Sequence, residues 1–167
     1  MGGRAVAASL SRAALSAAVL VVGYFLIPLE GAHPATWVWF VLALAGWAVV
    51  ITRQVLAVSR SATPRLRAIE ALGLAVPLLL VVFAPTYTAL GRVDPTAFTE
   101  PVDKADALYY TVSVFATVGF GDIAPVSHTA RVVTTLQMVL GLIAVGLIAR
   151  VLVGAVSVAD RRRDRKR

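Results

Sequence analysis

The sequence predicts an all-α membrane protein in which each chain has four membrane-spanning helices and one shorter helix that enters the bilayer without crossing it. Hydrophobic residues make up 59% of the 167 residues and charged residues only 15%, whereas a soluble domain is about half apolar and a quarter charged. The apolar residues gather in long runs, and the basic residues stand mostly at the ends of those runs. A hydrocarbon core of ~30 Å requires about 20 apolar residues of helix, so runs near this length indicate a multi-pass membrane protein.

Four apolar runs are close to the length of a spanning helix. They comprise residues 13–29, 35–52, 68–87 and 132–159. Pro28 closes the first run, and we expect Pro77 to interrupt the third, because proline removes a backbone N–H from the helix. The second run carries Trp37, Trp39 and Trp47. Tryptophan near the ends of a membrane helix fits anchoring at the interface.

The first run has a competing interpretation as a secretory signal peptide. Arg4 and Arg12 precede it, as basic residues precede the apolar part of such a peptide. However, no convincing small-x-small cleavage site follows Pro28. We therefore expect an ordinary first spanning helix.

Residues 105–116 form an apolar run that is too short to cross a bilayer. A helix of about 12 residues reaches only roughly 18 Å at 1.5 Å per residue. Asp103 is a good N-cap for this helix, and Asp106 adds negative charge near the positive end of the helix dipole. We therefore expect a re-entrant helix that starts at Asp103, in a place where protein or water surrounds it.

The distribution of basic residues predicts the orientation. With the N-terminus inside, 12 of the 16 Lys and Arg residues lie on the cytoplasmic side and 3 lie outside, while Arg150 falls within the last run. This bias predicts cytoplasmic N- and C-termini in the cell membrane. We divide the chain into an N-terminal transmembrane hairpin with a cytosolic loop (1–67), a second unit (68–159) and a basic cytosolic tail (160–167). The tail is typical of a topology anchor or of a contact with anionic lipids.

Composition and spacing exclude several classes of function. The chain has no cysteine, so disulfides and thiolate metal sites are excluded. Its net charge of +7 would suit a nucleic-acid partner, but no basic stripe interleaved with aromatic residues is present. No nucleophile–base pair, phosphate loop or metal-ligand cluster is visible, so we predict that it is not an enzyme. His33 and His128 lie in predicted external loops without a second ligand at metal spacing; external pH sensing through His128 is a hypothesis.

The most informative segment is the hexapeptide at 117–122, which reads TVGFGD. Gly119 and Gly121 alternate with other residues, and glycine adopts positive φ at little steric cost, which lets the backbone turn its carbonyl oxygens to one side. Four such segments around an axis would form rings of oxygen atoms that replace the water around a dehydrated cation.

From about residue 68 to 159 the chain resembles the pore domain of potassium channels. The hexapeptide carries the resemblance, with Phe120 where tyrosine is commoner, and Pro125, Gly141, Gly146 and the short helix support it. The resemblance implies a potassium-selective channel that conducts K⁺ passively through a selectivity filter. One filter segment cannot enclose an ion, so the expected assembly is a homotetramer with C4 symmetry. The permeant K⁺ ions are the only bound ions that we expect.

The resemblance also implies roles for individual residues. The filter oxygens for K⁺ would come from Thr117, Val118, Gly119, Phe120 and Gly121. Asp122 would hydrogen-bond behind the filter, where the usual partner is tryptophan and this chain has Tyr109, whose phenol can still donate. A second supporting position often holds glutamate and is Ser113 here.

The last run would line the inner pore of such a channel. Gly141 stands 19 residues after Asp122, at the usual hinge position. The residues that would face the ion path are Leu142, Val145, Ala149 and Val153, and their apolar side chains would allow closure by dewetting. Close helix packing is an equal alternative for Gly141 and Gly146, because small residues let membrane helices approach.

We expect no special function for Arg150 or for the first two helices. We expect Arg150 to reach the inner headgroups by snorkelling; the alternative is a salt bridge to Glu70. The first two runs lack regularly spaced arginines, so we expect weak or no voltage sensing and a peripheral packing role. Two rival functions stay open: a cation transporter with a discontinuous helix, which predicts an inverted repeat that is not visible, and a non-conducting accessory membrane protein.

Overall fold

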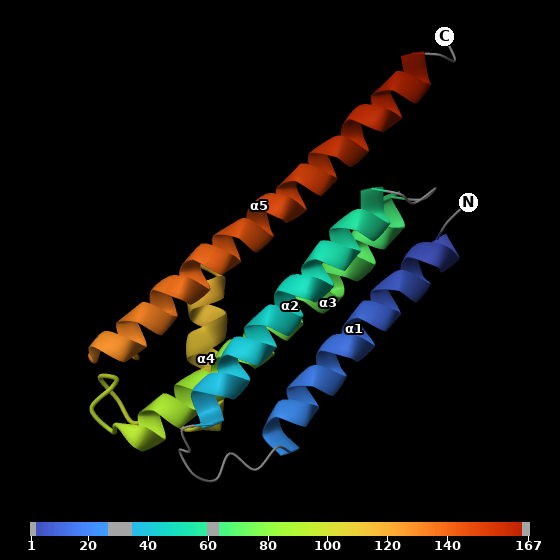
Figure 1. Ribbon diagram of the computed structural model, residues 1–167. Coiled ribbons are helices and arrows are strands. Elements are labelled where there is room, and N and C mark those ends of the chain that lie inside the picture. The colour runs from blue at the N-terminus through green and yellow to red at the C-terminus, as the bar shows by residue number, and fades with distance from the viewer. Residues whose placement is uncertain (1–2, 27–34, 60–63, 165–167) are drawn as a thin grey trace.

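The computed structural model describes residues 3–26, 35–59 and 64–164. Five α-helices account for most of these ranges. They are α1 Gly3–Leu26, α2 Ala35–Ser59, α3 Pro64–Val93, α4 Lys104–Phe115 and α5 His128–Asp164. Figure 1 shows the four long helices running roughly side by side, with the short α4 near the end at which α5 begins. The predicted all-α class is confirmed for the described part of the chain.

Three of the predicted spanning runs lie wholly within a longer helix, and the described part of the first run, residues 13–26, lies within α1. α1 begins at Gly3 rather than at residue 13, and α2 continues to Ser59 rather than to residue 52. Residues 27–29 of the first run lie outside the described residues. Apolar runs mark the part of a helix that suits the hydrocarbon core, whereas the backbone hydrogen bonds of the helix continue into more polar sequence.

The third helix does not break at Pro77. α3 continues from Pro64 to Val93 through both Pro77 and Pro85, so the predicted interruption is wrong. Proline is tolerated inside membrane helices where neighbouring helices re-satisfy the freed backbone groups, and α3 packs against all four other helices. Pro64 itself suits the first helical position, where its missing N–H has no partner to lose.

The last helix extends beyond a single membrane crossing. α5 has 37 residues, which corresponds to roughly 55 Å at 1.5 Å per residue. It runs through Asp164, so residues 160–164 of the predicted tail belong to the helix, while 165–167 lie outside the described residues. The boundary that we predicted at residue 160 is therefore not a break in secondary structure.

Three helices in the described part of the chain are long and apolar enough to cross a membrane. These candidate spans are Trp37–Val58 in α2, Gly73–Val93 in α3 and His128–Gly146 in α5. α1 contributes a shorter apolar stretch, Leu10–Leu26. Three of the four predicted spans are thus supported, and a crossing by α1 stays a prediction.

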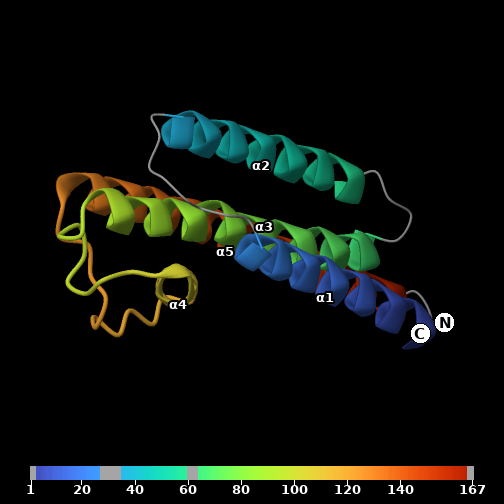
Figure 2. The ribbon, with the colours of Figure 1, turned by 90° about the horizontal axis from the view of Figure 1, so that it is seen from below.

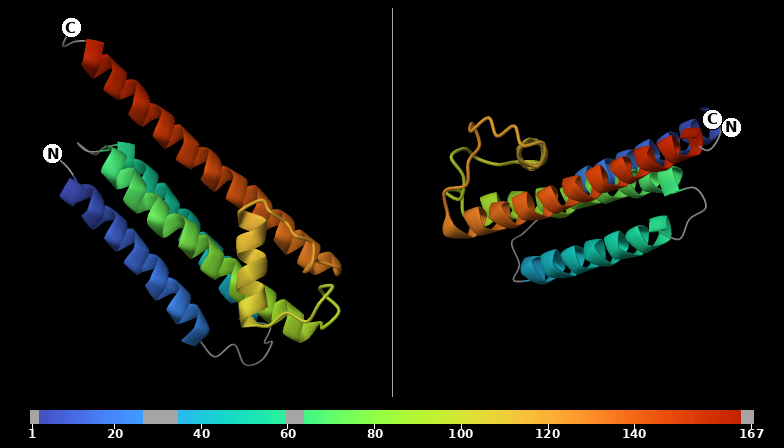
Figure 3. Two further views of the ribbon diagram at one scale, coloured as in Figure 1. Left: turned by 180° about the vertical axis from the view of Figure 1, so that it is seen from behind. Right: turned by 90° about the horizontal axis from the view of Figure 1, so that it is seen from above.

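α3 is the central helix of the bundle. α1 and α2 each pack mainly against α3 rather than against each other. Seen from below, α2 lies on one side of α3, whereas α4 and the loop that follows it lie on the opposite side (Figure 2). The view from above agrees (Figure 3). The short helix and the TVGFGD segment therefore project from the side of the bundle that faces away from α2.

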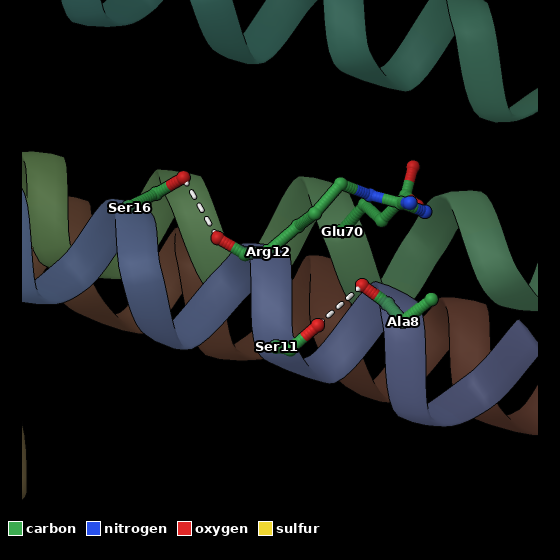
Figure 4. Close-up of polar contacts among 5 residues, drawn as sticks. All are labelled: Ala8, Ser11, Arg12, Ser16 and Glu70. Atoms are coloured by element: carbon green, nitrogen blue, oxygen red, sulfur yellow. Dashed lines mark hydrogen bonds and ion pairs between the residues drawn. The ribbon is translucent and has the colours of Figure 1, made fainter. Parts of the chain in front are cut away.

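α1 packs closely on α3 because both helices carry small residues at the contact. A Cβ atom added at Gly73 would lie 2.1 Å from the Cβ of Ala13, a distance that no pair of side chains can occupy. Small residues at such crossings let membrane helices approach closely. Nearby, the guanidinium of Arg12 forms an ion pair with Glu70 of α3 (Figure 4). Glu70 therefore has a partner on α1; the side chain of Arg150, its predicted alternative partner, lies outside the described residues.

The far end of α1 is tied to the start of α4. The buried hydroxyl of Tyr24 donates to the carbonyl oxygen of Lys104 at 2.8 Å and lies 3.0 Å from the hydroxyl oxygen of Thr88 on α3. In return, the Nζ of Lys104 donates to the carbonyl oxygen of Phe25 at 2.9 Å. This lysine thereby satisfies one of the carbonyls that a helix end leaves without a helical partner.

An aromatic cluster fills the space between α3 and α4. The ring of Tyr87 lies edge-on to Tyr110 at 5.0 Å and to Phe98 at 5.8 Å between centroids, and Phe83 continues the cluster toward α2 through Phe40. Edge-to-face pairs of this kind are favourable beyond their buried area. The cluster fixes α4 against α3 and so determines where the segment after α4 begins.

Candidate functional site

The short helix begins as the sequence predicts and has a stronger cap than expected. Asp103 is the N-cap, and its carboxylate accepts from the backbone N–H of Ala105 at 2.6 Å and of Asp106 at 2.9 Å. The carboxylate of Asp106 accepts in turn from the backbone N–H of Asp103 at 3.1 Å. This reciprocal arrangement is a capping box. The backbone N–H of Asp106, with that of Ala105, donates to the charged carboxylate of Asp103 and lowers its pKa below the ordinary value.

The last turn of α4 holds the backbone of the TVGFGD segment. The carbonyl oxygen of Ser113 accepts from the N–H of Val118 at 3.0 Å and from that of Gly119 at 3.4 Å, and the N–H of Thr117 donates to Val114 at 3.1 Å. No cis peptide bond occurs in the described chain, so each of these peptides has its C=O opposite its N–H. The carbonyl groups of Ala116, Thr117 and Val118 therefore point away from α4.

The backbone angles of the segment alternate. Thr117, Gly119 and Gly121 have positive φ values of 58°, 57° and 82°, and Thr117 is the only non-glycine residue with positive φ in the described chain. Alternation of this kind turns every second peptide plane, so that successive carbonyls share a side, as they do not in a β-strand. Positive φ is uncommon for threonine and costs free energy that its surroundings must offset.

The whole segment is open on its outer side. Residues 117–122 are all exposed, with Val118 at 53% and Phe120 at 68%. A Cβ added at Gly119 or Gly121 would meet no atom within 4 Å. The glycines are thus required by their φ angles and not by a close neighbour within the chain.

Asp122 follows the segment and is held by two donors. Its Oδ2 accepts from the phenol of Tyr109 at 2.7 Å, and its Oδ1 accepts from the N–H of Ile123 at 2.9 Å. The ring of Tyr109 stacks on Phe120 with centroids 6.1 Å apart. The Tyr109 bond, followed by the Ile123 N–H, lowers the pKa of Asp122 below its ordinary value, and the same bond raises the pKa of Tyr109. The hydrogen bond anticipated between these two side chains is present.

The loop between α3 and α4 forms hydrogen bonds with the chain around Asp122, and the sequence did not predict this contact. The hydroxyl of Thr99 donates to the carbonyl oxygen of Asp122 at 2.9 Å and accepts from the N–H of Ala124 at 2.9 Å. The N–H of Thr99 donates to the carbonyl oxygen of Ala124 at 3.0 Å, and Phe98 bridges to Pro125. A lone threonine in a polar loop gives no sequence signal for this role.

The predicted gate residues on α5 differ in their surroundings. Leu142 and Val145 are exposed at 72% and 43%, on a face of α5 that the described part of the chain leaves largely uncovered. Gly141 is buried, and an added Cβ there would lie 3.4 Å from Cδ2 of Phe115 at the end of α4. Gly146 has open space around it. The side chains of Ala149, Arg150 and Val153 lie outside the described residues.

The buried face of α5 carries two polar contacts with α4 that sequence reasoning missed. Gln137, which is 1% exposed, donates from Nε2 to the carbonyl oxygen of Thr111 at 2.8 Å. The hydroxyl of Tyr110 lies 2.9 Å from that of Thr134. A glutamine inside an apolar membrane run was the available signal, because polar residues there are costly unless they are partnered.

The two histidines do not enter this arrangement. His128 is the first residue of α5 and is exposed. With Arg131, Val132 and neighbouring residues it lines a shallow groove of about 410 Å³ along α5. His33 lies outside the described residues.

Comparison of the sequence with models of known protein families identifies the class of protein to which these helices and the loop between α4 and α5 belong. Residues 75–157 match the family model described as "Ion channel", which covers most of α3, all of α4, the TVGFGD segment and much of α5. The chain therefore belongs to the ion channel family, with a pore domain preceded by additional helices, and it is not an enzyme. No curated protein and no solved structure matches the chain.

Proposed function

We propose that this ion channel is selective for K⁺ and that the filter is the segment 117–121. The observation that carries the proposal is that the N–H groups of Val118 and Gly119 both donate to the Ser113 carbonyl. In trans peptides these bonds turn the carbonyls of Thr117 and Val118 away from α4. Neutral oxygen dipoles of this kind bind K⁺ in place of its water and still release it, as conduction requires. Transport is passive, and the ion gradient supplies the energy.

We further propose that four chains assemble around the filter with C4 symmetry. A single segment with its carbonyls on one side cannot surround an ion, and a cyclic homo-oligomer is the simplest closure. The exposed filter, the uncovered apolar face at Leu142 and the groove beginning at His128 all support contacts with further copies. In this assembly Asp122 stands at the external mouth, and Leu142, Val145 and Ala149 line the inner path.

The proposed topology has four crossings, with α1 as the first. α1 starts and α5 ends on the same side of the bundle (Figure 1), which fits an even number of crossings. The excess of Lys and Arg on that side favours cytoplasmic termini. The basic end of the chain would then contact anionic lipid headgroups or act as a topology anchor.

The proposal is tested by flux from the purified protein in liposomes. We expect rapid K⁺ flux, much slower Na⁺ flux, and block by Ba²⁺. Slow, saturable flux would favour a transporter instead, and no flux would favour an accessory protein.

A pair of glycine variants makes the test specific to the filter. Gly119→Ala places a side chain at φ 57°, whereas Gly46→Ala in α2 places one in equally open space within a helix. Alanine tolerates helical angles and is strained at positive φ. We expect Gly119→Ala to lose selective K⁺ flux and Gly46→Ala to keep it; equal behaviour of the two variants would contradict the assignment of the filter.

A further inference from the structure

Gln137 connects three helices through one buried amide. It lies in the candidate span of α5 and is 1% exposed. Its Oε1 accepts from the hydroxyl of Tyr87 on α3 at 2.7 Å, and its Nε2 donates to the carbonyl oxygen of Thr111 on α4 at 2.8 Å. Among the described residues no buried side-chain nitrogen or oxygen lacks a partner, so this amide is fully integrated into the core.

The connection leads directly to the proposed filter. Thr111 lies one turn before the end of α4. Two residues further on, the carbonyl oxygen of Ser113 accepts from the N–H groups of Val118 and Gly119. The end of α4 thus carries the filter backbone, and Gln137 holds that same end from the side of α5.

Burying the amide of Gln137 at this position costs free energy unless its polar atoms are hydrogen-bonded. An apolar side chain of similar length would fill the space without the cost of removing polar atoms from water. Hydrogen bonds have a direction and a narrow range of length, so the amide allows one axial and rotational setting of α5 against α4, where apolar packing allows several. Buried polar groups are best supported as devices that fix register in this way.

We propose that Gln137 is a positioning residue for ion selection: its bond to the Thr111 carbonyl sets the place of the filter relative to α5. This inference rests on the proposed K⁺ selectivity of segment 117–121. The geometry that selects the ion would then depend partly on a side chain that touches neither the ion nor the filter.

The test compares two substitutions that break different bonds of the same amide. Gln137→Met keeps the length of the side chain and removes both hydrogen bonds, whereas Tyr87→Phe removes only the bond to α3. The full chain is purified, reconstituted in liposomes and measured for its ratio of K⁺ to Na⁺ flux and for its thermal melting in detergent.

We expect both variants to melt at lower temperature, but only Gln137→Met to lose selectivity. The expected fall in the flux ratio is about threefold, which is what an interhelical hydrogen bond of average strength in a membrane protein is worth. If Gln137→Met does not assemble, Gln137→Asn serves in its place, because it keeps the amide but is too short to reach both partners.

Three results would overturn the inference. A wild-type flux ratio in the Gln137 variant would show that the amide only contributes stability. An equal loss of selectivity in Tyr87→Phe would show that any weakening of the core suffices. Wild-type protein that passes K⁺ and Na⁺ equally would overturn the proposed function itself, and is recognised before any variant is compared.

Discussion

The phenol of Tyr109 and the carboxylate of Asp122 form a hydrogen bond of 2.7 Å across the TVGFGD segment, from the middle of α4 to the residue that follows the proposed filter. The bond closes a loop of chain whose other anchor is the Ser113 carbonyl. The proposed filter is therefore held at both ends by α4, and not only at its start.

The first prediction concerns the effect of external pH on this bond. The pKa of Asp122 is lowered, mainly by the Tyr109 bond, so the stabilisation from the bond is present above the ordinary aspartate pKa of about 3.9. It is lost as pH falls through the lowered value in the folded protein. The raised pKa of Tyr109 keeps the phenol protonated across this range.

Tyr109→Phe should therefore shift the acid sensitivity upward. The ring keeps its stacking on Phe120, but Asp122 loses its main donor, so its pKa should rise toward the ordinary value. We expect the external pH at which K⁺ current is half lost to be higher in this variant than in the wild type. The check is a titration of current through bilayers between pH of about 3 and 6. An unchanged midpoint would contradict a role for Asp122 at the mouth.

The second prediction concerns the brace at Thr99. Thr99→Val keeps the shape of the side chain and removes the hydroxyl that bonds both the Asp122 carbonyl and the Ala124 N–H. We expect faster decay of K⁺ current during sustained opening, because the end of the proposed filter next to Asp122 loses support.

Thr96→Val is the matched control for Thr99→Val. Its hydroxyl bonds Asp94 within the same loop and does not reach the filter segment. We expect its current to decay at the wild-type rate, and Thr99→Ser to restore that rate. Equal decay in both valine variants would show that the loop acts only as a whole.

The third prediction concerns the docking of α1. Gly73→Ala would place a Cβ 2.1 Å from that of Ala13, and overpacking of this kind typically costs about 1–3 kcal/mol. We expect a lower melting temperature in detergent. The exchange Ala13→Gly with Gly73→Ala should recover most of the loss, because it moves the methyl group to the other helix. Failure of the exchange to recover any stability would indicate that the two helices do not meet at these residues.

The fourth prediction distinguishes a hinge at Gly141 from a role of this glycine in close helix packing. An added Cβ would make an ordinary contact of 3.4 Å with Phe115, and alanine is favoured over glycine inside a helix by about 1 kcal/mol. We expect Gly141→Ala to melt at or above the wild-type temperature. Reduced opening in this intact protein, measured from single-channel open probability, would then reflect a stiffer helix. Loss of stability would show that the site has no room for the methyl group.

Local residue types were sufficient to predict the elements of this protein. Long apolar runs predicted the helices of the bundle, because the thickness of a bilayer sets the length of such a run. Asp103 predicted the start of α4, since a capping carboxylate acts on neighbours in sequence. The alternation of Gly119 and Gly121 predicted a backbone with positive φ, which was found together with an unexpected positive φ at Thr117.

The tertiary structure alone decided which residues act on the segment from a distance. The unbroken course of α3 through Pro77, the brace from Thr99 and the amide of Gln137 all depend on which helix lies beside which. A glutamine in an apolar run indicates that a partner is needed, but the sequence does not say which residue that partner is, because packing and not the period of a helix decides which distant residues meet. The alternating glycines of the sequence determined that the chain after α4 would turn through positive φ angles; the packing of α3, α4 and α5 around Gln137 determined how that turn is held.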